Sequence, residues 1–484
     1  MKKQTRVSAM AVSSYFKQMC TNKIGLFLIM ALLIQQAGAQ NPKIKVYFNH
    51  PVNNSVSTGT NAIYVQNTMA DTIAAYITRA KYSVDIAQYD YSASSSYSAM
   101  AIIATACNTA HSKGVVVRWI YDGSQPNSGL PLLNSAINKL ASPVVTNYIM
   151  HNKFVAIDAT SATATDPYVI TGSNDWGITQ TDSCFNNLVI IQDKPLTNAY
   201  YLEFNKMWGG TGPAPVSANS KFSTNKTHSA QNVFNVNGTT VEVYFSPKDT
   251  AEAHMVKAIN TVNNEFFFGI YTFTDNTIAN LLKTKYTGGI AGFGMIDSYS
   301  QTNTPYTTLS PVMGANLKVY TGPSSYVVYH NKTMLIDPLT PSSDPQVVTG
   351  SYNWTSAANT TNDENMIIIH DASVTNQYYQ SFCQNFKDLG GTACPATATG
   401  IEELQQEEVM NVFPNPFADE LHVQLTISAP EATLCIYNSL GKLMMSKLVN
   451  NNTDVVLNTS SLSKGLYFLS YSDGEKTIYK KVIR

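Results

Sequence analysis

Charged side chains are scarce in this sequence. Only 13% of the 484 residues are Asp, Glu, Lys or Arg, and the 31 basic and 32 acidic residues leave a formal net charge of −1 at pH 7. Proteins that bind nucleic acid regardless of its sequence rely on an excess of Lys and Arg to neutralise the phosphates. The composition therefore argues against a general nucleic-acid binder, although it does not exclude a local basic groove.

Long apolar runs are also missing, apart from one near the N-terminus. The run at residues 24–34 is shorter than the ~18 residues that a transmembrane helix needs. It follows a basic start and precedes Ala37-Gly38-Ala39, a pattern typical of a secretory signal peptide at residues 1–39. The alternative is a membrane anchor behind a long cytoplasmic extension. Removal of this segment changes the formal charge from −1 to −6, because it holds five basic residues and no acid.

Cysteine is infrequent, with six residues and no Cys-x-x-Cys pair or His/Cys cluster. The sequence therefore predicts no metal site and no cofactor. Cys383 and Cys394 lie near each other across a Gly-Gly turn, so an oxidising compartment could join them in a disulfide.

One nine-residue phrase occurs twice: MHNKFVAID at 150–158 and YHNKTMLID at 329–337. In both copies His and Lys are two residues apart, so on a strand they share one face, and an apolar run then anchors that strand in a core. We expect the two strands to bring two imidazoles and two ammonium groups to one anion. The residues concerned are His151, Lys153, His330 and Lys332.

The phrase belongs to a longer internal repeat. Strand, helix and strand patterns at 44–48, 71–81 and 83–91 reappear at 241–245, 254–263 and 265–273, and later strands end in Gly-Ser at 172–173 and 350–351. An Asn, Asn187 or Asn365, follows fifteen residues after each of these glycines. The pattern predicts an α/β fold of two duplicated lobes, each with a partly parallel sheet, related by a pseudo-twofold axis.

Composition shifts divide the chain further. Beyond the second lobe, short strand patterns separated by turn residues predict a small β-sandwich. The predicted divisions are a signal peptide at 1–39, a first lobe at 40–208, a surface linker at 209–240, a second lobe at 241–392, a linker at 393–410 and the β-sandwich at 411–484.

Two imidazoles that face a phosphodiester can divide its cleavage between them. One attacks phosphorus while the other protonates the departing oxygen, and the two lysines neutralise the non-bridging oxygens. Ser173, Ser351 and Asn353 end neighbouring strands and are candidate hydrogen-bond donors to the same oxygens.

The two His-x-Lys-x4-Asp phrases, each followed by Gly-Ser and an Asn, resemble the phospholipase D superfamily over roughly residues 43–392. The resemblance implies two α-β-α lobes and attack by one His to give a phosphohistidine, followed by hydrolysis without metal. It also implies His151 as the nucleophile and His330 as the acid, unless Glu364 raises the basicity of its partner His and reverses the order.

The sequence departs from the family pattern in its first half. The family reads Gly-Ser-x-Asn; the second half complies with Asn353, whereas the first has Asp175, and Asn186 stands where the second half has Glu364. We therefore expect weaker secondary contacts around His151. The signature residues Asp158 and Asp337 are an odd number of positions from His, on the opposite strand face, and are expected to support the structure.

The C-terminal segment resembles the type A sorting domain of the Bacteroidetes type IX secretion system. The resemblance rests on FPNPF at 413–417, NSLGK at 438–442, KGLY at 464–467 and KKVIR at 480–484. It implies export to the cell surface or medium and leaves cleavage of the domain open.

These patterns predict a secreted, monomeric phospholipase D-type phosphodiesterase that acts on phospholipid head groups and uses the type IX machinery for export. The first alternative is an extracellular metal-independent nuclease. The second is an inactive surface protein that binds phosphate esters, an alternative that Asp175 keeps open.

Overall fold

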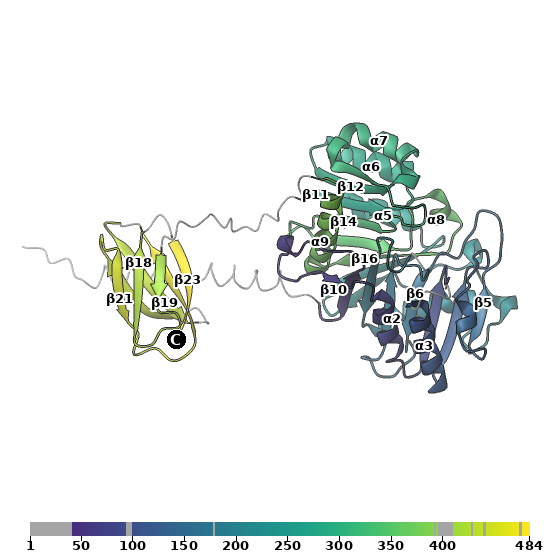
Figure 1. Cartoon of the computed structure of the whole chain (residues 1–484), viewed down its shortest axis with the longest axis horizontal. Coiled ribbons are helices and arrows are strands. Elements are labelled where there is room, and N and C mark those ends of the chain that lie inside the picture. Colours follow the sequence, from purple (N-terminus) through teal and green to yellow (C-terminus); the bar gives the residue numbers. More distant parts are fainter. Residues whose placement is uncertain are drawn as a thin grey trace, which may run out of the picture. The chain divides into compact units, whose positions relative to one another are not determined.

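The computed structural model describes residues 41–92, 99–177, 180–391, 394, 410–426, 429–438, 442–473 and 477–484 (Figure 1). Residues 37–397 form one compact unit and residues 398–484 belong to a second. The predicted signal peptide at 1–39 and nearly all of the predicted linker at 393–410 lie outside the described residues. Among the described residues, no helix has both the length and the apolar character needed to cross a membrane.

The first lobe is built on an eight-stranded sheet in the order β2-β1-β8-β7-β6-β3-β4-β5. Its strands are β1 (Ile44–Phe48), β2 (Ile63–Tyr64), β3 (Ser83–Gln88), β4 (Val116–Tyr121), β5 (Asn138–Ala141), β6 (Lys153–Ile157), β7 (Tyr168–Gly172) and β8 (Asn187–Ile191). Its helices are α2 (Met69–Ile77), α3 (Ala99–Ser112) and α4 (Lys194–Trp208).

The second lobe repeats this plan with an eight-stranded sheet in the order β13-β12-β11-β14-β15-β16-β10-β9. Its strands are β9 (Val233–Val236), β10 (Thr239–Ser246), β11 (Glu265–Ile270), β12 (Ala291–Asp297), β13 (Leu317–Tyr320), β14 (Lys332–Ile336), β15 (Gln346–Gly350) and β16 (Glu364–His370). Its helices are α5 (Ala251–Asn260), α6 (Asn276–Thr287), α7 (Thr304–Met313), α8 (Ser356–Thr360) and α9 (Ala372–Asp388).

Counted from β5 in the first sheet and from β13 in the second, the first seven strands of the two sheets have the same topology. In each, three consecutive strands pair in parallel, β3-β4-β5 and β11-β12-β13, while β6 to β8 and β14 to β16 pair antiparallel. The predicted α/β fold of two duplicated lobes with partly parallel sheets is confirmed.

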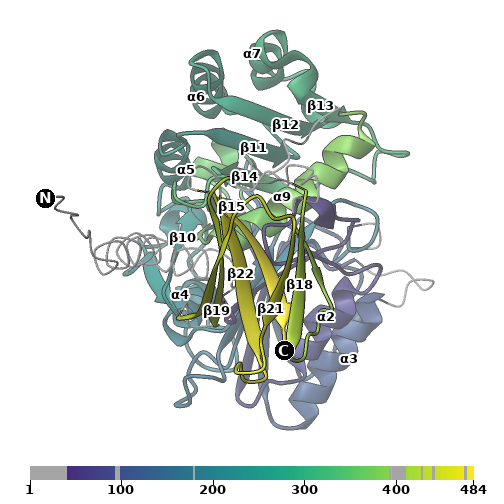
Figure 2. The ribbon, with the colours of Figure 1, turned by 90° about the vertical axis from the view of Figure 1, so that its left-hand side faces the viewer.

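One apolar core joins the lobes. It contains Phe204 and Trp208 from α4, Tyr379 and Phe382 from α9, and inward residues of both sheets. The outer faces are covered separately, by α2 and α3 on the first sheet and by α5, α6 and α7 on the second (Figure 1; Figure 2). Because the lobes share a core, the strand ends that face each other between them are held in fixed relation.

The predicted boundaries shift where side chains bind backbone groups. The first helix ends at Ile77 rather than residue 81, because the chain then turns and the Asp158 carboxylate accepts hydrogen bonds from the N–H groups of Lys81, Tyr82 and Ser83. Strand β6 begins at Lys153, so His151 precedes it; the His151 N–H donates to Asp363 O of the other lobe at 2.8 Å.

The prediction of a surface linker at 209–240 is wrong for its second part. Strand β9 pairs with β10 and buries Phe234 and Val236 in the shared core. Lys226, also in this segment, is 3% exposed. The polar composition concealed these contacts, because the buried lysine is stabilised by carboxylates that are distant in sequence.

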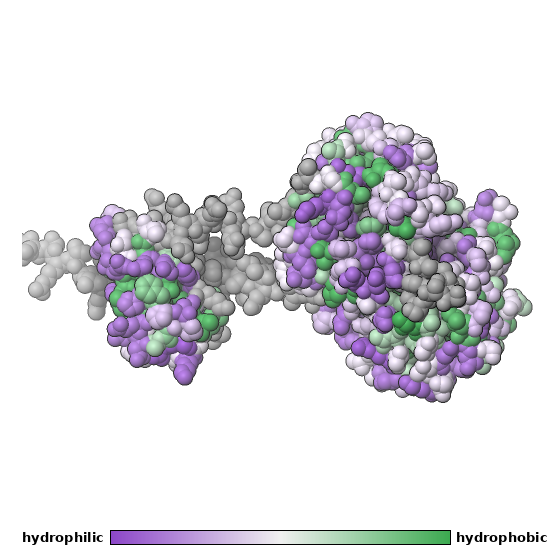
Figure 3. All heavy atoms as spheres, viewed as in Figure 1, coloured by the Kyte–Doolittle hydropathy of each residue, from purple (hydrophilic) through white to green (hydrophobic). Residues whose placement is uncertain are grey.

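Cys383 and Cys394 form a disulfide with a Cα–Cα distance of 5.5 Å, one of the states that the sequence allowed. It ties the end of α9 to the following chain. On the face drawn in Figure 3, hydrophilic and hydrophobic residues are intermingled over the surface of the unit at residues 37–397.

The C-terminal unit is a sandwich of two antiparallel sheets, as predicted. One sheet has the order β17-β18-β21 and the other β20-β19-β22-β23. The strands are β17 (Met410–Phe413), β18 (Glu420–Leu425), β19 (Ala432–Asn438), β20 (Leu443–Val449), β21 (Asp454–Asn458), β22 (Leu466–Ser472) and β23 (Thr477–Ile483). Most residues of β20 are exposed, so burial imposes little alternation on its sequence.

Candidate active site

The four predicted catalytic side chains meet between the lobes. His151 and His330 are each 4% exposed, and Lys153 and Lys332 are 3% and 2% exposed. Asp175 shows how close the halves come: its Oδ1 lies 2.5 Å from Lys153 Nζ, and its Oδ2 lies 3.6 Å from His330 Nε2. Both His-Lys pairs therefore face one buried polar space.

Glu364 of the second lobe supports the histidine of the first. His151 Nδ1 lies 2.7 Å from Glu364 Oε2. Ser351 Oγ donates to the same oxygen at 2.6 Å, and Asn362 Nδ2 donates to Oε1 at 3.2 Å. The expectation of weak support around His151 is wrong, because the pseudo-twofold axis exchanges supporting residues between the halves.

The corresponding contact of His330 is made to an uncharged residue. His330 Nδ1 lies 3.0 Å from Asn186 Oδ1, which also accepts a hydrogen bond from Ser173 Oγ at 2.8 Å. Both histidines thus turn Nδ1 toward an acceptor in the opposite half, which leaves Nε2 as the ring nitrogen for chemistry. Ser173 and Ser351 each donate a hydrogen bond to one of these acceptors.

Burial and the two lysines disfavour the protonated form of both imidazoles. Burial, with the nearby Lys153 and Lys332 ammonium groups, holds the pKa of His151 well below its usual range. Burial and the same two lysines also hold the pKa of His330 well below that range. An anionic substrate would offset the lysines and favour the protonated form of a histidine that faces it.

The pKa values of two further buried groups, Lys332 and Glu364, shift as well. Burial, reinforced by the charge of Lys153, lowers the pKa of Lys332 to about 7. Burial raises the pKa of Glu364 to about 8, against the hydrogen bond from Ser351 and the charge of Lys153. Lys332 and Glu364 therefore change charge near neutral pH.

The two lysines differ in their partners. Lys153 is paired with Asp175, whereas Lys332 Nζ donates to His330 O at 2.7 Å and lies 5.4 Å from the Tyr271 ring centroid. Asn353, which corresponds to Asp175, instead accepts a hydrogen bond from Thr272 N at 3.4 Å. The Lys332 charge thus lacks the acidic partner that Asp175 gives Lys153.

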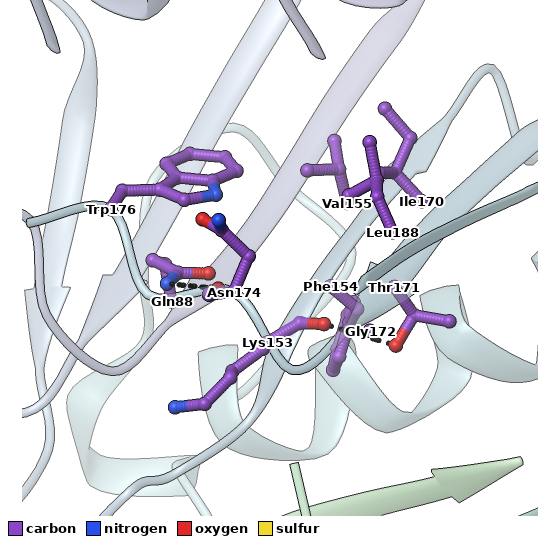
Figure 4. A pocket seen from close by; sticks show the side chains of 10 residues that line it. All are labelled: Gln88, Lys153, Phe154, Val155, Ile170, Thr171, Gly172, Asn174, Trp176 and Leu188. Carbon is purple, nitrogen blue, oxygen red and sulfur yellow. Dashed lines mark hydrogen bonds between the residues drawn. The ribbon is translucent and has the colours of Figure 1, made fainter. Parts of the chain in front are cut away.

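Asn174, the residue between Ser173 and Asp175, points away from the site. Its Nδ2 contacts Met69 Sδ at 2.9 Å. It lines a pocket with Gln88, Trp176 and an apolar wall, and Lys153 is the predicted catalytic side chain that reaches this pocket (Figure 4). Neither histidine lines it, so we regard it as a packing gap behind Lys153 rather than the place of the reaction.

Asp158 and Asp337 lie at the far ends of their strands. Asp158 accepts backbone hydrogen bonds from residues 81–83, and Asp337 accepts them from residues 263–265. Both adopt positive φ, 52° and 47°. This placement fits the predicted structural role, since each carboxylate anchors the turn that leads into a central strand.

Two tyrosines beside the histidines were not predicted as site residues. The Tyr89 ring centroid lies 4.8 Å from that of His151, and the Tyr271 centroid lies 5.2 Å from that of His330. Lys153 Nζ is 4.9 Å from the Tyr89 centroid. The repeated patterns Tyr89-x-Tyr91 and Tyr271-x-Phe273 were the available signal.

Asp122 and Asp297 also act next to the motifs. They accept hydrogen bonds from Met150 N at 2.6 Å and Tyr329 N at 2.8 Å, the residues directly before the two histidines. Across the part of the chain that the structure describes, no group of three or more His, Cys, Asp or Glu side chains is arranged to hold a metal ion.

Comparison with known families agrees with this geometry. The family described as cardiolipin synthase, PLD-like domain, matches residues 73–208 and 255–386, more than half of the chain. The secretion system C-terminal sorting domain matches residues 411–484.

Individual relatives cover smaller parts. A phospholipase D of Rickettsia bellii is 25% identical over 31% of this chain and 71% of its own length. A mitochondrial cardiolipin hydrolase of Xenopus tropicalis is 30% identical over 28% of this chain and 59% of its own length.

Among solved structures, the phosphatidylserine synthase of Haemophilus influenzae is 13% identical with a TM-score of 0.49, covering 76% of this chain and 91% of that chain. The phospholipase D family member Nuc of Salmonella typhimurium is 24% identical with a TM-score of 0.26, covering 31% of this chain and 94% of that chain. The family matches and the two converging His-x-Lys motifs lead to one conclusion: the chain belongs to the phospholipase D-like superfamily and ends in a type IX secretion sorting domain.

Proposed function

We propose that this protein is an exported phosphodiesterase that hydrolyses phospholipid head groups through a phosphohistidine intermediate. The observation that carries the proposal is that each histidine is hydrogen-bonded by a residue of the other lobe. His151 Nδ1 contacts Glu364, and His330 Nδ1 contacts Asn186. This leaves two Nε2 atoms and two lysines for one phosphodiester.

In the first step His151 acts as the nucleophile. Its Nε2 forms a bond to phosphorus while the bond from phosphorus to the head-group oxygen breaks, and protonated His330 gives its proton to that oxygen. Positive charge develops on the His151 ring, and a Glu364 carboxylate 2.7 Å from Nδ1 stabilises it. Asn186 carries no charge, so the His330 cation is less stabilised and releases its proton more readily.

In the second step water replaces the histidine. Neutral His330 takes a proton from water, the water oxygen attacks phosphorus, and the bond between phosphorus and His151 Nε2 breaks. Phosphatidic acid leaves and His330 is protonated again for the next cycle. The overall reaction consumes one water and needs no external proton donor.

Lys332 and Lys153 are assigned to the non-bridging phosphate oxygens. The Lys332 charge is the stronger contribution, because Asp175 offsets that of Lys153 at 2.5 Å. Asp175 Oδ2 also lies 3.6 Å from His330 Nε2, where its carboxylate favours protonation of that ring once the anionic substrate offsets the lysines. Its carboxylate weakens binding of the anion but leaves the machinery intact, which favours an active enzyme over an inactive binder.

Two observations favour lipid over nucleic acid. The relatives of this chain include proteins named phospholipase D and cardiolipin hydrolase. One of the two site lysines is already paired with Asp175, so the site offers limited excess charge to a polyanionic backbone. The nuclease remains the second candidate.

One assay set separates the candidates. Purified full-length protein in EDTA is offered phosphatidylcholine vesicles and, separately, plasmid DNA. Choline release without nicking supports the proposal, nicking alone supports the nuclease, and tight vesicle binding without turnover by either route supports the inactive binder. His330→Asn should abolish whichever activity appears, and His228→Asn, the same change at an exposed histidine outside the described contacts of both site histidines, serves as the matched control.

We propose further that residues 1–39 direct the chain across the inner membrane and that residues 411–484 then carry it to the cell surface or medium. Because one chain supplies both His-x-Lys motifs, a monomer is sufficient for activity. Light scattering of the purified protein tests this, and activity confined to a dimer fraction would contradict it.

A further inference from the structure

Beneath the active site lies a buried ion cluster, which we call the Lys226 cluster: Lys226, Glu203 and Asp363. We propose that it positions the nucleophile, by holding the His151–Glu364 hydrogen bond in register across the two lobes. The inference rests on the proposed function and extends it to residues outside both His-x-Lys motifs.

Lys226 is fully satisfied in this cluster. Its Nζ lies 2.5 Å from Glu203 Oε1, 2.7 Å from Asp363 Oδ1 and 2.8 Å from Ser246 O. The side chains of the three charged residues are at most 1% exposed. Burial disfavours the Lys226 ammonium, but the charges of Asp363 and Glu203 outweigh that effect and raise its pKa, so the lysine is charged.

Asp363 links this cluster to both partners of the catalytic hydrogen bond. It directly precedes Glu364 in the chain. Its N–H donates to Ile149 O at 3.1 Å and its carbonyl accepts from His151 N at 2.8 Å. Its side chain accepts from Tyr148 OH at 2.7 Å and Ser223 N at 2.9 Å. One residue thus fixes the backbone that carries His151 and the backbone that carries Glu364.

On the His330 side, the equivalent contact between the lobes is made by an uncharged residue. Phe185 precedes Asn186 as Asp363 precedes Glu364, and its N–H donates to Val328 O at 3.1 Å. Its ring packs 5.4 Å from the Tyr329 centroid and 4.9 Å from the Tyr320 centroid. The fold therefore tolerates an apolar residue at this position, and buried ion pairs are in general weak contributors to stability. Stability alone does not account for the cluster on the His151 side.

Loss of Lys226 should act on the nucleophile. Two buried carboxylates, Asp363 and Glu203, would then lie without their shared cation. Burial already raises the pKa of Asp363, so without the lysine that carboxyl takes up a proton and loses its strength as an acceptor for Tyr148 and Ser223. The segment that carries Glu364 can then move relative to His151.

The test compares Lys226→Met with Lys206→Met. Lys206 Nζ lies 2.9 Å from Glu203 Oε2, its side chain is partly exposed, and among the described residues it forms no ion pair with Asp363, so it is the matched control. We expect phosphoenzyme formation to slow about 10- to 100-fold in Lys226→Met, with KM changed less than about 2-fold, because misplacement of a reacting group by about 1 Å costs rates of this size. Lys206→Met should keep both values within about 2-fold of wild type.

A readout without substrate separates this inference from the proposed function. Histidine-selective NMR of the full chain, assigned by His151→Gln, follows the His151 Nδ1 proton and the ring titration. Lys226→Met and the milder Tyr148→Phe should shift both, while Asp85→Asn, which breaks the buried 2.6 Å pair with Arg118 in the first lobe, should destabilise the protein and leave them unchanged. His151 signals like those of wild type in both cluster variants would overturn the positioning role. Equal shifts of these signals in Asp85→Asn would overturn it as well. A wild-type protein that is inactive on every phosphodiester would refute only the proposed function.

Discussion

The two half-sites carry the same His-x-Lys motif but support it differently. His151 is held by a carboxylate, and the residue before that carboxylate belongs to a buried ion cluster. His330 is held by an amide, and the residue before that amide is an aromatic ring in an apolar contact. Under the proposed mechanism this difference divides the roles: the carboxylate supports His151 as it gains positive charge, and the amide leaves His330 free to release a proton.

Removal of each histidine should separate the roles most clearly. His151→Ala should lower the rate by about 10³-fold or more on any substrate, because no phosphoenzyme forms. His330→Ala should fail equally on phosphatidylcholine but regain phosphoenzyme formation on a p-nitrophenyl phosphodiester, whose leaving group needs no proton. Stopped-flow release of p-nitrophenol measures this difference. Rescue of His151→Ala instead would reverse the assignment.

Glu364→Gln should reduce the rate by about 10²- to 10³-fold, since the amide cannot stabilise the charge that develops on His151. The same variant tests a pH effect. In wild type the pKa of Glu364 is about 8. Below that pH its carboxyl holds a proton that it donates to Nδ1, and the ring hydrogen then occupies Nε2 and blocks attack. The rate of phosphoenzyme formation should therefore rise with pH up to about 8.

A pH–rate profile of single-turnover kinetics measures this effect. Glu364→Gln should lose the ascending limb, and Asn186→Ala is the control that should keep it. A wild-type profile that is flat between pH 6 and 8 would contradict the role of Glu364.

Affinity for inorganic phosphate should show the opposite trend. The pKa of Lys332 is about 7, so its ammonium is charged below that pH and loses its charge as pH rises through it. Inhibition by phosphate should weaken severalfold between pH 6 and 8 after correction for phosphate ionisation. Lys332→Arg keeps its charge over this range and should remove the trend; an unchanged trend in that variant would assign it to another group.

Asp175→Asn should produce the smallest change. It restores the residue type of the second half and removes a carboxylate 2.5 Å from Lys153. We expect phosphate to bind about 3- to 10-fold more tightly, because the Lys153 charge is no longer offset. Asn353→Asp is the mirror control and should weaken binding. Weaker binding in Asp175→Asn would show that the carboxylate serves the substrate rather than opposing it.

The sequence predicted the fold in some detail, because its evidence is local or repeated. Apolar strand patterns located β1, β7 and β15, and the repeated phrases identified four side chains that the structure brings together, His151, Lys153, His330 and Lys332. It misassigned the partner of Glu364, because a pseudo-twofold axis exchanges residues that are 213 positions apart in the chain. It also missed Lys226, whose carboxylate partners come from distant elements and leave no local pattern.

The departures at Asp175 and Asn186 were visible in the sequence, but their meaning was not. Asn186 proved to face His330 rather than His151, so the weaker support lies on the side opposite to the prediction. Asp175 enters the site instead of turning away, because the Lys153 ammonium stabilises it there. In a duplicated enzyme, the contacts across the axis decide which half a substitution affects.

The most direct test is to trap the covalent intermediate and identify the labelled residue. Enzyme mixed with ³²P-labelled phosphodiester is quenched in alkali, in which phosphohistidine survives, and the peptides are mapped by mass spectrometry. The account predicts label on His151, and its loss in Glu364→Gln at early times. Label on His330, or turnover with no labelled histidine at all, would contradict the division of roles between the two halves.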